Sequence, residues 1–411
     1  MPARREVLKW LASLPLVGSL AGAGLVKNAA GNPLMQPVYR RDFFRELGLR
    51  PFINGRGTIT ALSGSLMRPE VIEAINYASQ QFVDLNELQR LVGERIAEML
   101  RCEAAMVTSG AASAMTLGTA AAVTGTDREL IRLIPNLEGP PREVIIQRSH
   151  RFGYDHAVRN AGVKLIEVEG PDEMEQAINE RTVMMLFYNA AGRHSVSKEE
   201  FVRIGKKHRR PTFNDAAADV PPVENLFRYI EMGFDLVTFS GGKAIRGPQS
   251  AGLLYGKKEL IEAALLNNNP NGDTIGRGMK VNKEEMLAMM VALEDYLQRD
   301  HKKDWQQWEE WVARIASEAE KVPHVTTDVY VPSVANHVPH LRVSWDQDAV
   351  PVSGGQVVQL LRFGHPSIEV GGGGNSISIS VFMMQPEEIG IVGRRVRETL
   401  QQAMASTLEN P

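Results

Sequence analysis

Short apolar runs alternate with helical segments through the middle of the chain, and this alternation constrains the fold more than any other feature of the sequence. The runs are typical of buried strands, and the segments between them show the apolar periodicity of amphipathic helices. The predicted strands are 104–108, 144–147, 164–168, 183–188, 211–214, 236–239 and 251–255, and the predicted helices are 109–123, 154–161, 172–179, 198–207, 223–232 and 257–266. Alternation of this kind favours an α/β domain with a mostly parallel, seven-stranded sheet.

The segments on either side of this region follow other patterns. A short amphipathic helix is predicted within 39–50, and two helices are predicted within 69–100, before the first strand. After the breaker-rich stretch 267–278, a long helix is predicted over 283–319, and the mixed pattern beyond it indicates a smaller α+β domain. We therefore expect an N-terminal arm at 39–68, a large α/β domain at 69–280, and a linking helix with the small domain at 281–411.

The first 31 residues have the form of an export signal. Arg4 and Arg5 precede an uncharged run from Trp10 to Val26, and this pattern resembles the twin-arginine signal, which exports folded proteins. The alternative is a buried N-terminal helix, although the glycines in the run disfavour a helix. Pro15 and these glycines also make the run marginal for a permanent membrane span. We expect a periplasmic protein, with a cytoplasmic location as the alternative.

Composition and isolated motifs exclude several classes of function. The 411 residues include 46 basic and 49 acidic side chains, so the chain has no global positive field that would attract nucleic acid. The basic run 206–210 falls at the end of a predicted helix, where cations complement the helix dipole, and we expect no nucleic-acid partner. Cys102 is the single cysteine and is assigned to the core. His337 and His340 lack a third ligand nearby, so no metal is expected.

Three local motifs stand at strand ends in the predicted sheet. The first is Ser109-Gly110-Ala111, where a strand meets a helix. Backbone amides at a helix N-terminus bind phosphate, although small residues also serve simply to close a tight turn. The second is Asp215, an acid at the carboxyl end of an apolar strand, where either a ligand contact or a helix N-cap is possible. The third is Lys243, which follows two glycines just past another apolar strand.

Together the three motifs match the requirements of one cofactor. Pyridoxal 5'-phosphate needs amides for its phosphate, a carboxylate for its ring nitrogen and a lysine amine for its aldehyde. The sequence offers these groups in that order, with Lys243 placed 28 residues after Asp215. This is the arrangement of the aspartate-aminotransferase-like fold, fold type I of the pyridoxal-phosphate enzymes, and we expect that fold for the large domain.

Several segments also resemble a known family. They are 52–60 (FINGRGTIT), 82–89 (FVDLNELQ), 108–112, 240–243 (SGGK) and 247–252 (GPQSAG). The chain resembles the selenocysteine synthase-like family over 39–400, with closest similarity to the D-glucosaminate-6-phosphate ammonia-lyase-like branch. The segment around Lys243 is the most specific part of this resemblance, and the C-terminal part is the least specific.

The resemblance implies roles for individual residues. Lys243 would form the Schiff base with the cofactor, and Asp215 would pair with its ring nitrogen. Ser109, Gly110 and Ala111 would hold the phosphate together with Ser240. His150 lies at the next strand end, where it would either face the cofactor ring or cap a turn. The family also implies a small-molecule substrate, either an amino acid or an amino-sugar acid, and a homodimer or higher homo-oligomer.

The expected reaction is removal of the Cα proton, elimination at Cβ and release of ammonia. Racemisation, transamination and replacement at Cβ remain alternatives, as does selenium transfer to seryl-tRNA within the family. A binding protein without catalysis is the alternative of another class. Two departures bear on the substrate: Arg56 stands where a small residue is expected, and Gly371 stands where related sequences often carry an arginine. Arg277 and Lys280 are candidates either for binding an anion or for surface solvation.

Overall fold

The computed structural model describes residues 41–408, and the chain divides after Arg50 into two units, each described here by itself. In the first unit the described residues form α2 (Phe43–Glu46), which is shorter than the helix predicted within 39–50. Asp42 caps this helix by accepting a hydrogen bond from the Arg45 amide. The signal predicted at 1–31 lies outside the described residues.

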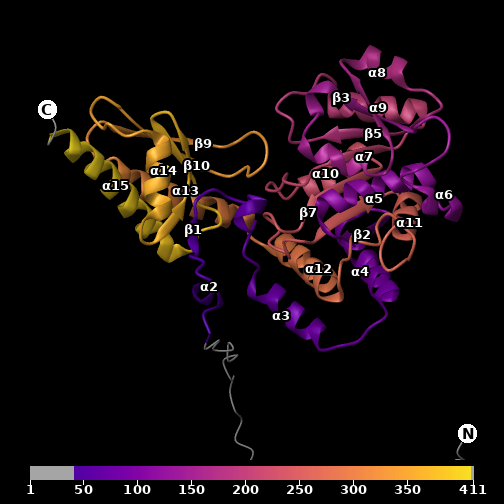
Figure 1. Ribbon diagram of the computed structural model, residues 1–411, viewed down its shortest axis with the longest axis horizontal. Helices are drawn as coiled ribbons and strands as arrows, with labels where there is room; N and C mark the ends of the chain where they lie inside the picture. The colour runs from indigo at the N-terminus through magenta and orange to yellow at the C-terminus, as the bar shows by residue number, and fades with distance from the viewer. Residues whose placement is uncertain (1–40, 409–411) are drawn as a thin grey trace, which may run out of the picture. The chain divides into compact units, whose positions relative to one another are not determined.

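A seven-stranded sheet forms the centre of the second unit (Figure 1). Its strand order is β2-β8-β7-β6-β5-β3-β4, and every pairing is parallel except those of β8 with β2 and β7. The strands are β2 (Ala104–Thr108), β3 (Glu143–Gln147), β4 (Lys164–Val168), β5 (Thr182–Tyr188), β6 (Thr212–Asp215), β7 (Leu236–Ser240) and β8 (Gly252–Gly256). The mostly parallel sheet predicted from the sequence is therefore confirmed. The carboxyl ends of the six strands other than β8 meet at one edge, where β8 begins.

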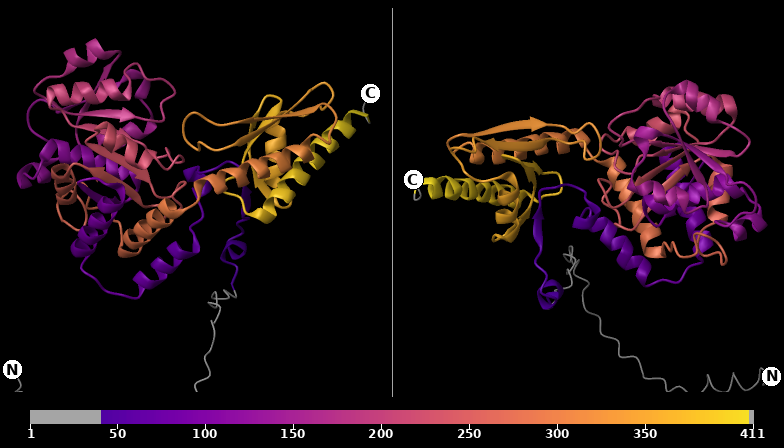
Figure 2. Two further views of the ribbon diagram at one scale, coloured as in Figure 1. Left: turned by 180° about the vertical axis from the view of Figure 1, so that it is seen from behind. Right: turned by 45° about the horizontal axis from the view of Figure 1, so that its top comes forward.

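Helices cover both faces of this sheet (Figure 2). Alternate residues of a strand enter different cores: in β5, Met184 and Leu186 belong to one apolar cluster, while Met185 and Phe187 belong to the other. The first cluster includes residues of α5 (Gly110–Thr124), α7 (His156–Arg159) and α11 (Lys258–Leu266), and the second includes residues of α3 (Pro69–Ser79), α4 (Leu85–Leu100), α8 (Pro171–Ala177), α9 (Lys198–His208), α10 (Asn225–Met232) and α12 (Lys283–Gln298). Burial on both faces explains why the inner strands of this sheet are mostly apolar, whereas the edge strand β4 has exposed charged residues.

A second sheet follows later in the chain, with the order β12-β13-β10-β9 and antiparallel pairing throughout. Its glycine-rich segment forms a hairpin in which β12 pairs with β13. A separate parallel pair joins β1 to β11. These strands and the helices around them are β1 (Phe52–Asn54), β9 (Val325–Tyr330), β10 (His340–Trp345), β11 (Ser367–Glu369), β12 (Gly371–Gly373), β13 (Ser376–Ser380), α13 (His301–Ala319), α14 (Gly354–Phe363) and α15 (Pro386–Leu408).

Two predicted helices need correction. The single helix predicted over 283–319 is two helices, because Arg299 is extended and Asp300 caps α13 through the amide of Lys303. The helix predicted over 154–161 is a 3-10 turn followed by the short α7. The sequence prediction also omitted α6 (Arg128–Leu133) and the 3-10 helices η1 (Thr60–Leu62), η2 (Arg148–His150) and η3 (Gly153–Asp155).

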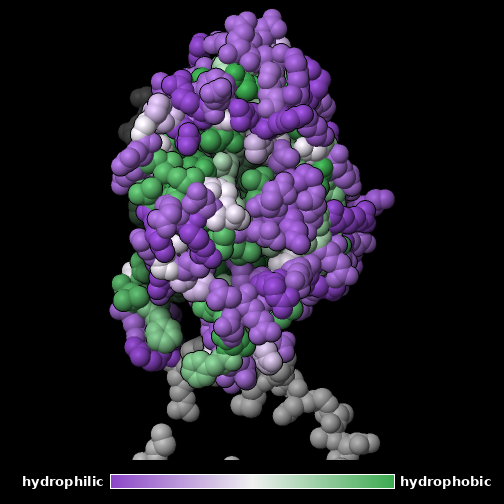
Figure 3. Space-filling view, turned by 90° about the vertical axis from the view of Figure 1, so that its right-hand side faces the viewer, coloured by the Kyte–Doolittle hydropathy of each residue, from purple (hydrophilic) through white to green (hydrophobic). Residues whose placement is uncertain are grey.

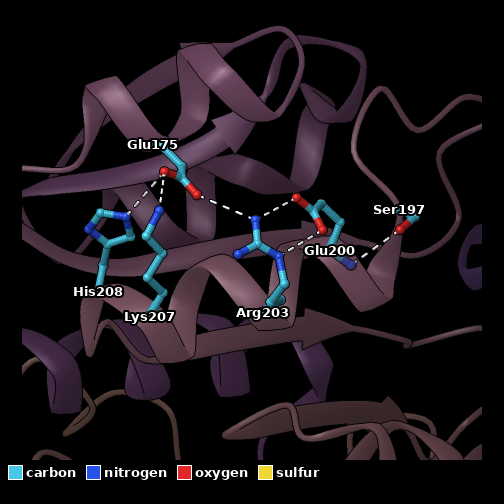
Figure 4. A network of polar contacts seen from close by, with 6 residues as sticks. All are labelled: Glu175, Ser197, Glu200, Arg203, Lys207 and His208. Carbon is cyan, nitrogen blue, oxygen red and sulfur yellow. Dashed lines mark hydrogen bonds and ion pairs between the residues drawn. The ribbon is translucent and has the colours of Figure 1, made fainter.

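Charged side chains on α8 and α9 form an exposed network (Figure 4). Glu175 accepts a hydrogen bond from the Lys207 amine at 2.6 Å, and it lies 3.8 Å from the His208 ring and 3.4 Å from Arg203. Exposed pairs of this kind contribute little to stability, because solvent screens their charges. Part of the basic run 206–210 therefore faces a carboxylate on the neighbouring helix, as expected of a solvated helix end.

Within residues 41–408, no helix combines the length and the apolar character that crossing a membrane would require. The same residues contain no group of three or more histidine, cysteine or acidic side chains placed to hold a metal ion.

Candidate active site

A cavity of about 210 Å³ lies at the sheet edge where the parallel strands end. It is lined from η1, the first turn of α5, the loop after β3, and the ends of β5, β6 and β7 with the loops that follow them. The lining residues are Thr60, Gly110, Ala111, Ala112, Met115, Phe152, Tyr154, Tyr188, Asn189, Ala190, Asp215, Ala216, Ala217, Ala218, Asp219, Ser240, Lys243 and Gln249. Segments far apart in the sequence thus meet at the ligand edge that the strand pattern predicts.

The first turn of α5 forms one wall of the cavity. Gly110 and Ala111 line it, and Ser109 is the N-cap residue but makes no side-chain capping hydrogen bond. Gly110 has a φ of +84°, a backbone conformation that favours glycine. Ser240 also lines the cavity, whereas the structure does not place Ser109 among the lining residues. Amides at the positive end of a 15-residue helix suit a phosphate group.

Gly252, at the start of β8, allows this turn to lie where it does. A Cβ atom at Gly252 would lie 2.6 Å from the carbonyl carbon of Gly110 and 2.7 Å from the amide nitrogen of Ala111. Both neighbours are backbone atoms, so neither can move without displacing the first turn of α5.

We therefore predict that Gly252→Ala weakens pyridoxal-phosphate binding by about tenfold or more and destabilises the fold by about 1–3 kcal/mol. Equilibrium dialysis and thermal unfolding measure the two effects. Gly355→Ala is the matched control, because a Cβ there meets nothing within 4 Å. Unchanged cofactor affinity in Gly252→Ala would contradict the role given to this close approach.

Asp215 ends β6 and is buried. Its Oδ1 accepts a hydrogen bond from the Ala217 amide at 3.1 Å, and its other carboxylate oxygen has no hydrogen-bond partner among the described residues. Burial raises the pKa of Asp215 to about 6, while the Ala217 amide and the charge of Lys243 act in the opposite direction. A carboxylate held in this way is stabilised by a cationic partner, which a protonated ring nitrogen would provide.

Lys243 follows β7 in a tight loop. The Gly241 amide donates to the Ala251 carbonyl at 2.8 Å, and the Arg246 amide donates to the Lys243 carbonyl at 2.9 Å. A Cβ at Gly242 would lie 2.4 Å from the Cα of Gln249, so the loop closes only with glycine there. Burial lowers the pKa of Lys243, and the charge of Asp215 opposes this shift. A lower pKa favours the neutral amine, which is the reactive form.

The residues of the cavity fit pyridoxal 5'-phosphate. Helix amides, a buried carboxylate and a buried lysine amine line one space, and these are the three groups that the cofactor requires. The cavity also has an aromatic wall, because the rings of Phe152 and Tyr188 stack with centroids 3.6 Å apart and planes 9° apart. The sequence analysis did not single out these two aromatic residues.

Asn189 and Asp219 also line the cavity and were missed from the sequence. Asn189 directly follows β5, and its Nδ2 donates to Asp219 and, at 2.9 Å, to the Tyr229 hydroxyl. Its Oδ1 is buried without a hydrogen-bond partner among the described residues. The position of Asn189 directly after an apolar strand could have identified it in the sequence, because a position at the end of an apolar strand also identified Asp215.

Of the two roles expected for His150, the structure does not support facing the cofactor ring, because His150 is not among the residues that line the cavity. His150 is fully buried, and its Nδ1 accepts a hydrogen bond from the Tyr188 amide at 3.1 Å. Its Nε2 lies 2.8 Å from Nδ1 of His194 and therefore donates to it. The hydrogen bond with Tyr188 instead connects η2, which follows β3, to the end of β5.

The buried His150 makes stability depend on pH. Burial lowers its pKa from 6.5 to about 3, and the charges of His194 and Lys198 act in the same direction. The unfolded chain therefore binds one more proton than the folded chain between these pH values. We predict that the free energy of unfolding falls by about 1.4 kcal/mol per pH unit below pH 6.5 because of this residue.

Denaturant unfolding between pH 7 and pH 5 measures this slope in wild type and in His150→Gln, which should lack the contribution. His156→Gln is the control, since His156 is exposed on α7. An equal slope in wild type and His150→Gln would contradict the assignment.

Comparison with known proteins agrees with this geometry. Residues 52–307 match the model of the family described as L-seryl-tRNA selenium transferase. A D-glucosaminate-6-phosphate ammonia lyase from Salmonella typhimurium is 32% identical over 269 residues, which are 62% of this chain and 70% of the relative. A 5'-C-glycyluridine monooxygenase-decarboxylase from a Streptomyces species is 27% identical over 79% of this chain and 83% of its own.

Solved structures give the same result for the fold. The structure of a D-glucosaminate-6-phosphate ammonia lyase superposes with a TM-score of 0.78 and 26% identity, over 89% of this chain and 99% of that chain. An aspartate aminotransferase from Thermotoga maritima has a TM-score of 0.50 and 16% identity, over 87% and 94% of the two chains. The large sheet with its helices thus has the aspartate-aminotransferase-like fold, as expected from the sequence.

Proposed function

The chain belongs to the L-seryl-tRNA selenium transferase family, and from this premise we propose that it is a pyridoxal-phosphate-dependent ammonia lyase acting on a hydroxylated amino acid of the amino-sugar acid class. The observation that carries the proposal is the single cavity that Lys243, Asp215 and the first turn of α5 line. This cavity occurs in a chain that is similar in sequence and structure to an enzyme with that activity.

The chain's own residues supply binding and proton transfer. When bound, pyridoxal phosphate supplies an electron sink next to the substrate's Cα. The amides of α5 would hold its phosphate, and Asp215 would keep a proton on its ring nitrogen. The amine of Lys243 is a base whose position is fixed by its loop, and it would take the proton from Cα. The stacked rings of Phe152 and Tyr188 form an aromatic wall on one side of the cavity.

The test is incubation of the purified, cofactor-loaded protein with D-glucosaminate, D-glucosaminate 6-phosphate and serine of both configurations. We expect ammonia and a 2-oxo acid to form in equal amounts from at least one of the sugar acids. Racemised substrate without ammonia would contradict lyase activity, and so would conversion of the cofactor to its amine form. The two sugar acids also decide whether the substrate carries a phosphate.

Selenium transfer to seryl-tRNA is the second candidate, because the matching family model carries that description. Incubation with seryl-tRNA and a reduced selenium donor, followed by analysis of the aminoacyl group, tests it. Conversion of the seryl group would favour this activity over the lyase. The part of the basic run 206–210 that pairs with Glu175 gives it no support.

We also propose a homodimer or higher homo-oligomer. Apolar side chains are exposed among polar ones on the molecular surface (Figure 3), and several of the large ones belong to α3, α4 and the segments beside them. These exposed residues are Leu66, Ile72, Tyr77, Phe82, Val83 and Leu91. Grouped exposed apolar residues are typical of protein interfaces. Light scattering on the purified protein measures the mass, and a monomer at micromolar concentration would contradict the proposal.

For the cellular location we propose the periplasm, on the basis of Arg4, Arg5 and the uncharged run from Trp10 to Val26. Fractionation of cells is expected to find a shortened chain outside the inner membrane. Replacing both arginines by lysine should retain the precursor in the cytoplasm. A full-length cytoplasmic chain in both cases would contradict export.

A further inference from the structure

The cavity contains a second carboxyl group, that of Asp219, which lies in the loop between β6 and α10. Its two oxygens have different surroundings. Oδ2 accepts hydrogen bonds from the Asn189 side chain, from the Tyr229 hydroxyl and, at 3.2 Å, from Nδ2 of Asn225. Oδ1 has no hydrogen-bond partner among the described residues. One oxygen thus fixes the carboxyl group in place while the other is free to act on a ligand.

The buried surroundings of Asp219 allow its carboxyl group to carry a proton near neutral pH. Burial raises its pKa to about 7, and the nearby charge of Asp215 acts in the same direction. Lys198 on α9 and Arg228 on α10 oppose the shift. A group whose pKa lies near the working pH is the most effective general acid, because it is partly protonated and still releases its proton readily.

We propose that Asp219 is the acid that protonates the departing hydroxyl group at Cβ of the substrate, an inference that rests on the proposed lyase activity. The electron pair left at Cα after Lys243 removes the proton forms the Cα–Cβ double bond. The Cβ–O bond breaks with its electron pair on oxygen, and the Asp219 proton converts that oxygen to water. The enamine that results takes up a proton at Cβ and loses one from nitrogen to become an imine. Water then adds at the imine carbon and ammonia leaves, so the overall change needs no oxidant or reductant.

The other ionisable side chains of the cavity suit this task less well. Lys243 serves as the base, and Asp215 pairs with the ring nitrogen. Tyr188 also lines the cavity, but burial raises its pKa above the ordinary tyrosine value near 10, and the charge of Asp215 acts in the same direction. Tyr154 lines the cavity as well, but most of its side chain is exposed. Asp219 is therefore the acid best matched to elimination of a hydroxyl group at neutral pH.

The decisive experiment compares leaving groups in holoenzyme carrying Asp219→Asn. With a β-hydroxy substrate we expect kcat/KM to fall by about 10²–10⁴-fold. With β-chloroalanine, whose chloride leaves without a proton, we expect a fall of about threefold or less, as a role confined to leaving-group protonation requires. Exchange of the Cα hydrogen with solvent deuterium should persist in the variant, because that step does not use Asp219.

Each result has a distinct meaning. Equal losses with both leaving groups, or a loss that depends on the leaving group in Tyr188→Phe and not in Asp219→Asn, would overturn the inference while leaving the lyase activity intact. Failure of the wild-type enzyme to release ammonia from any β-hydroxy acid would overturn the proposed function and this inference with it.

A second variant keeps the carboxyl group and changes only its pKa. Tyr229→Phe removes a hydrogen bond to the ionised form of Asp219, so the pKa of Asp219 should rise. The protonated acid then persists to higher pH, and the basic limb of the kcat/KM profile for the β-hydroxy substrate should move upward. The profile for β-chloroalanine should not move. An unchanged or downward-shifted basic limb for the β-hydroxy substrate would contradict the assignment, whether or not Asp219→Asn folds.

Discussion

Replacement of Lys243 by alanine is expected to lower kcat/KM for ammonia release by about 10⁴-fold or more, because one amine both carries the cofactor and removes the Cα proton. The loop around Lys243 is closed by main-chain hydrogen bonds and glycines, so truncating the side chain should leave the fold intact. Steady-state kinetics measure the loss, and thermal unfolding checks the fold.

Borohydride reduction of the wild-type holoenzyme followed by peptide mapping should place the pyridoxyl group on Lys243. Lys258→Ala is the control, since Lys258 is an exposed lysine on the neighbouring α11 and should keep both label and activity. A label on any other lysine would refute the assignment.

The variant Asp215→Asn is expected to keep most of the bound cofactor but to slow exchange of the Cα hydrogen by about 100-fold or more. A neutral amide cannot hold a proton on the ring nitrogen, whereas an adjacent carboxylate shifts such a titration by about 1–3 pH units. The variant also removes the negative charge that raises the pKa of Lys243, so the Lys243 amine should lose its proton at lower pH than in wild type.

Deuterium incorporation followed by mass spectrometry measures the exchange, and the cofactor absorbance at matched protein concentration gives the occupancy. Exchange at the wild-type rate with full occupancy would remove Asp215 from its assigned role. Loss of the cofactor itself would instead show that Asp215 acts mainly in binding.

Much of the sheet and the centre of the site could be predicted because both follow from short-range patterns. A strand buried on both faces is mostly apolar, and short apolar segments, with the half-exposed edge strand β4 as the exception to full burial, identified all seven strands of the large sheet. Parallel strands end at a common edge, so Gly110, Asp215 and Lys243 could be brought together although they lie far apart in the sequence. The structure places all three at one cavity.

The features that escaped prediction depend on contacts that no local pattern encodes. Asp219 lines the cavity, and hydrogen bonds from Asn189 and Tyr229, which belong to other elements, hold its carboxyl group in place. His150 and Phe152 lie two residues apart in the segment after β3. Phe152 lines the cavity and His150 does not, and this difference depends on how the segment packs. The break between α12 and α13 could not be predicted, because the helical periodicity of the sequence continues through it. The antiparallel direction of β8 could not be predicted either, because the composition of a strand does not indicate its direction.

The pairing of β2 with β8 has a consequence for the order in which the chain is made. In the large sheet β2 pairs with β8 alone, and Thr108 lies opposite Gly252. During synthesis β2, the first strand of the sheet, can therefore pair only after β8, the last strand, has been made. Pairing between strands so far apart in the sequence slows folding. A nascent chain that ends before β8 already contains Asp215 and Lys243 but lacks the strand against which the first turn of α5 sits. If the first turn of α5 binds the phosphate as proposed, a chain could take up the cofactor only after its sheet is complete. Under the proposed export of the folded protein, cofactor uptake would then distinguish finished chains from partial ones.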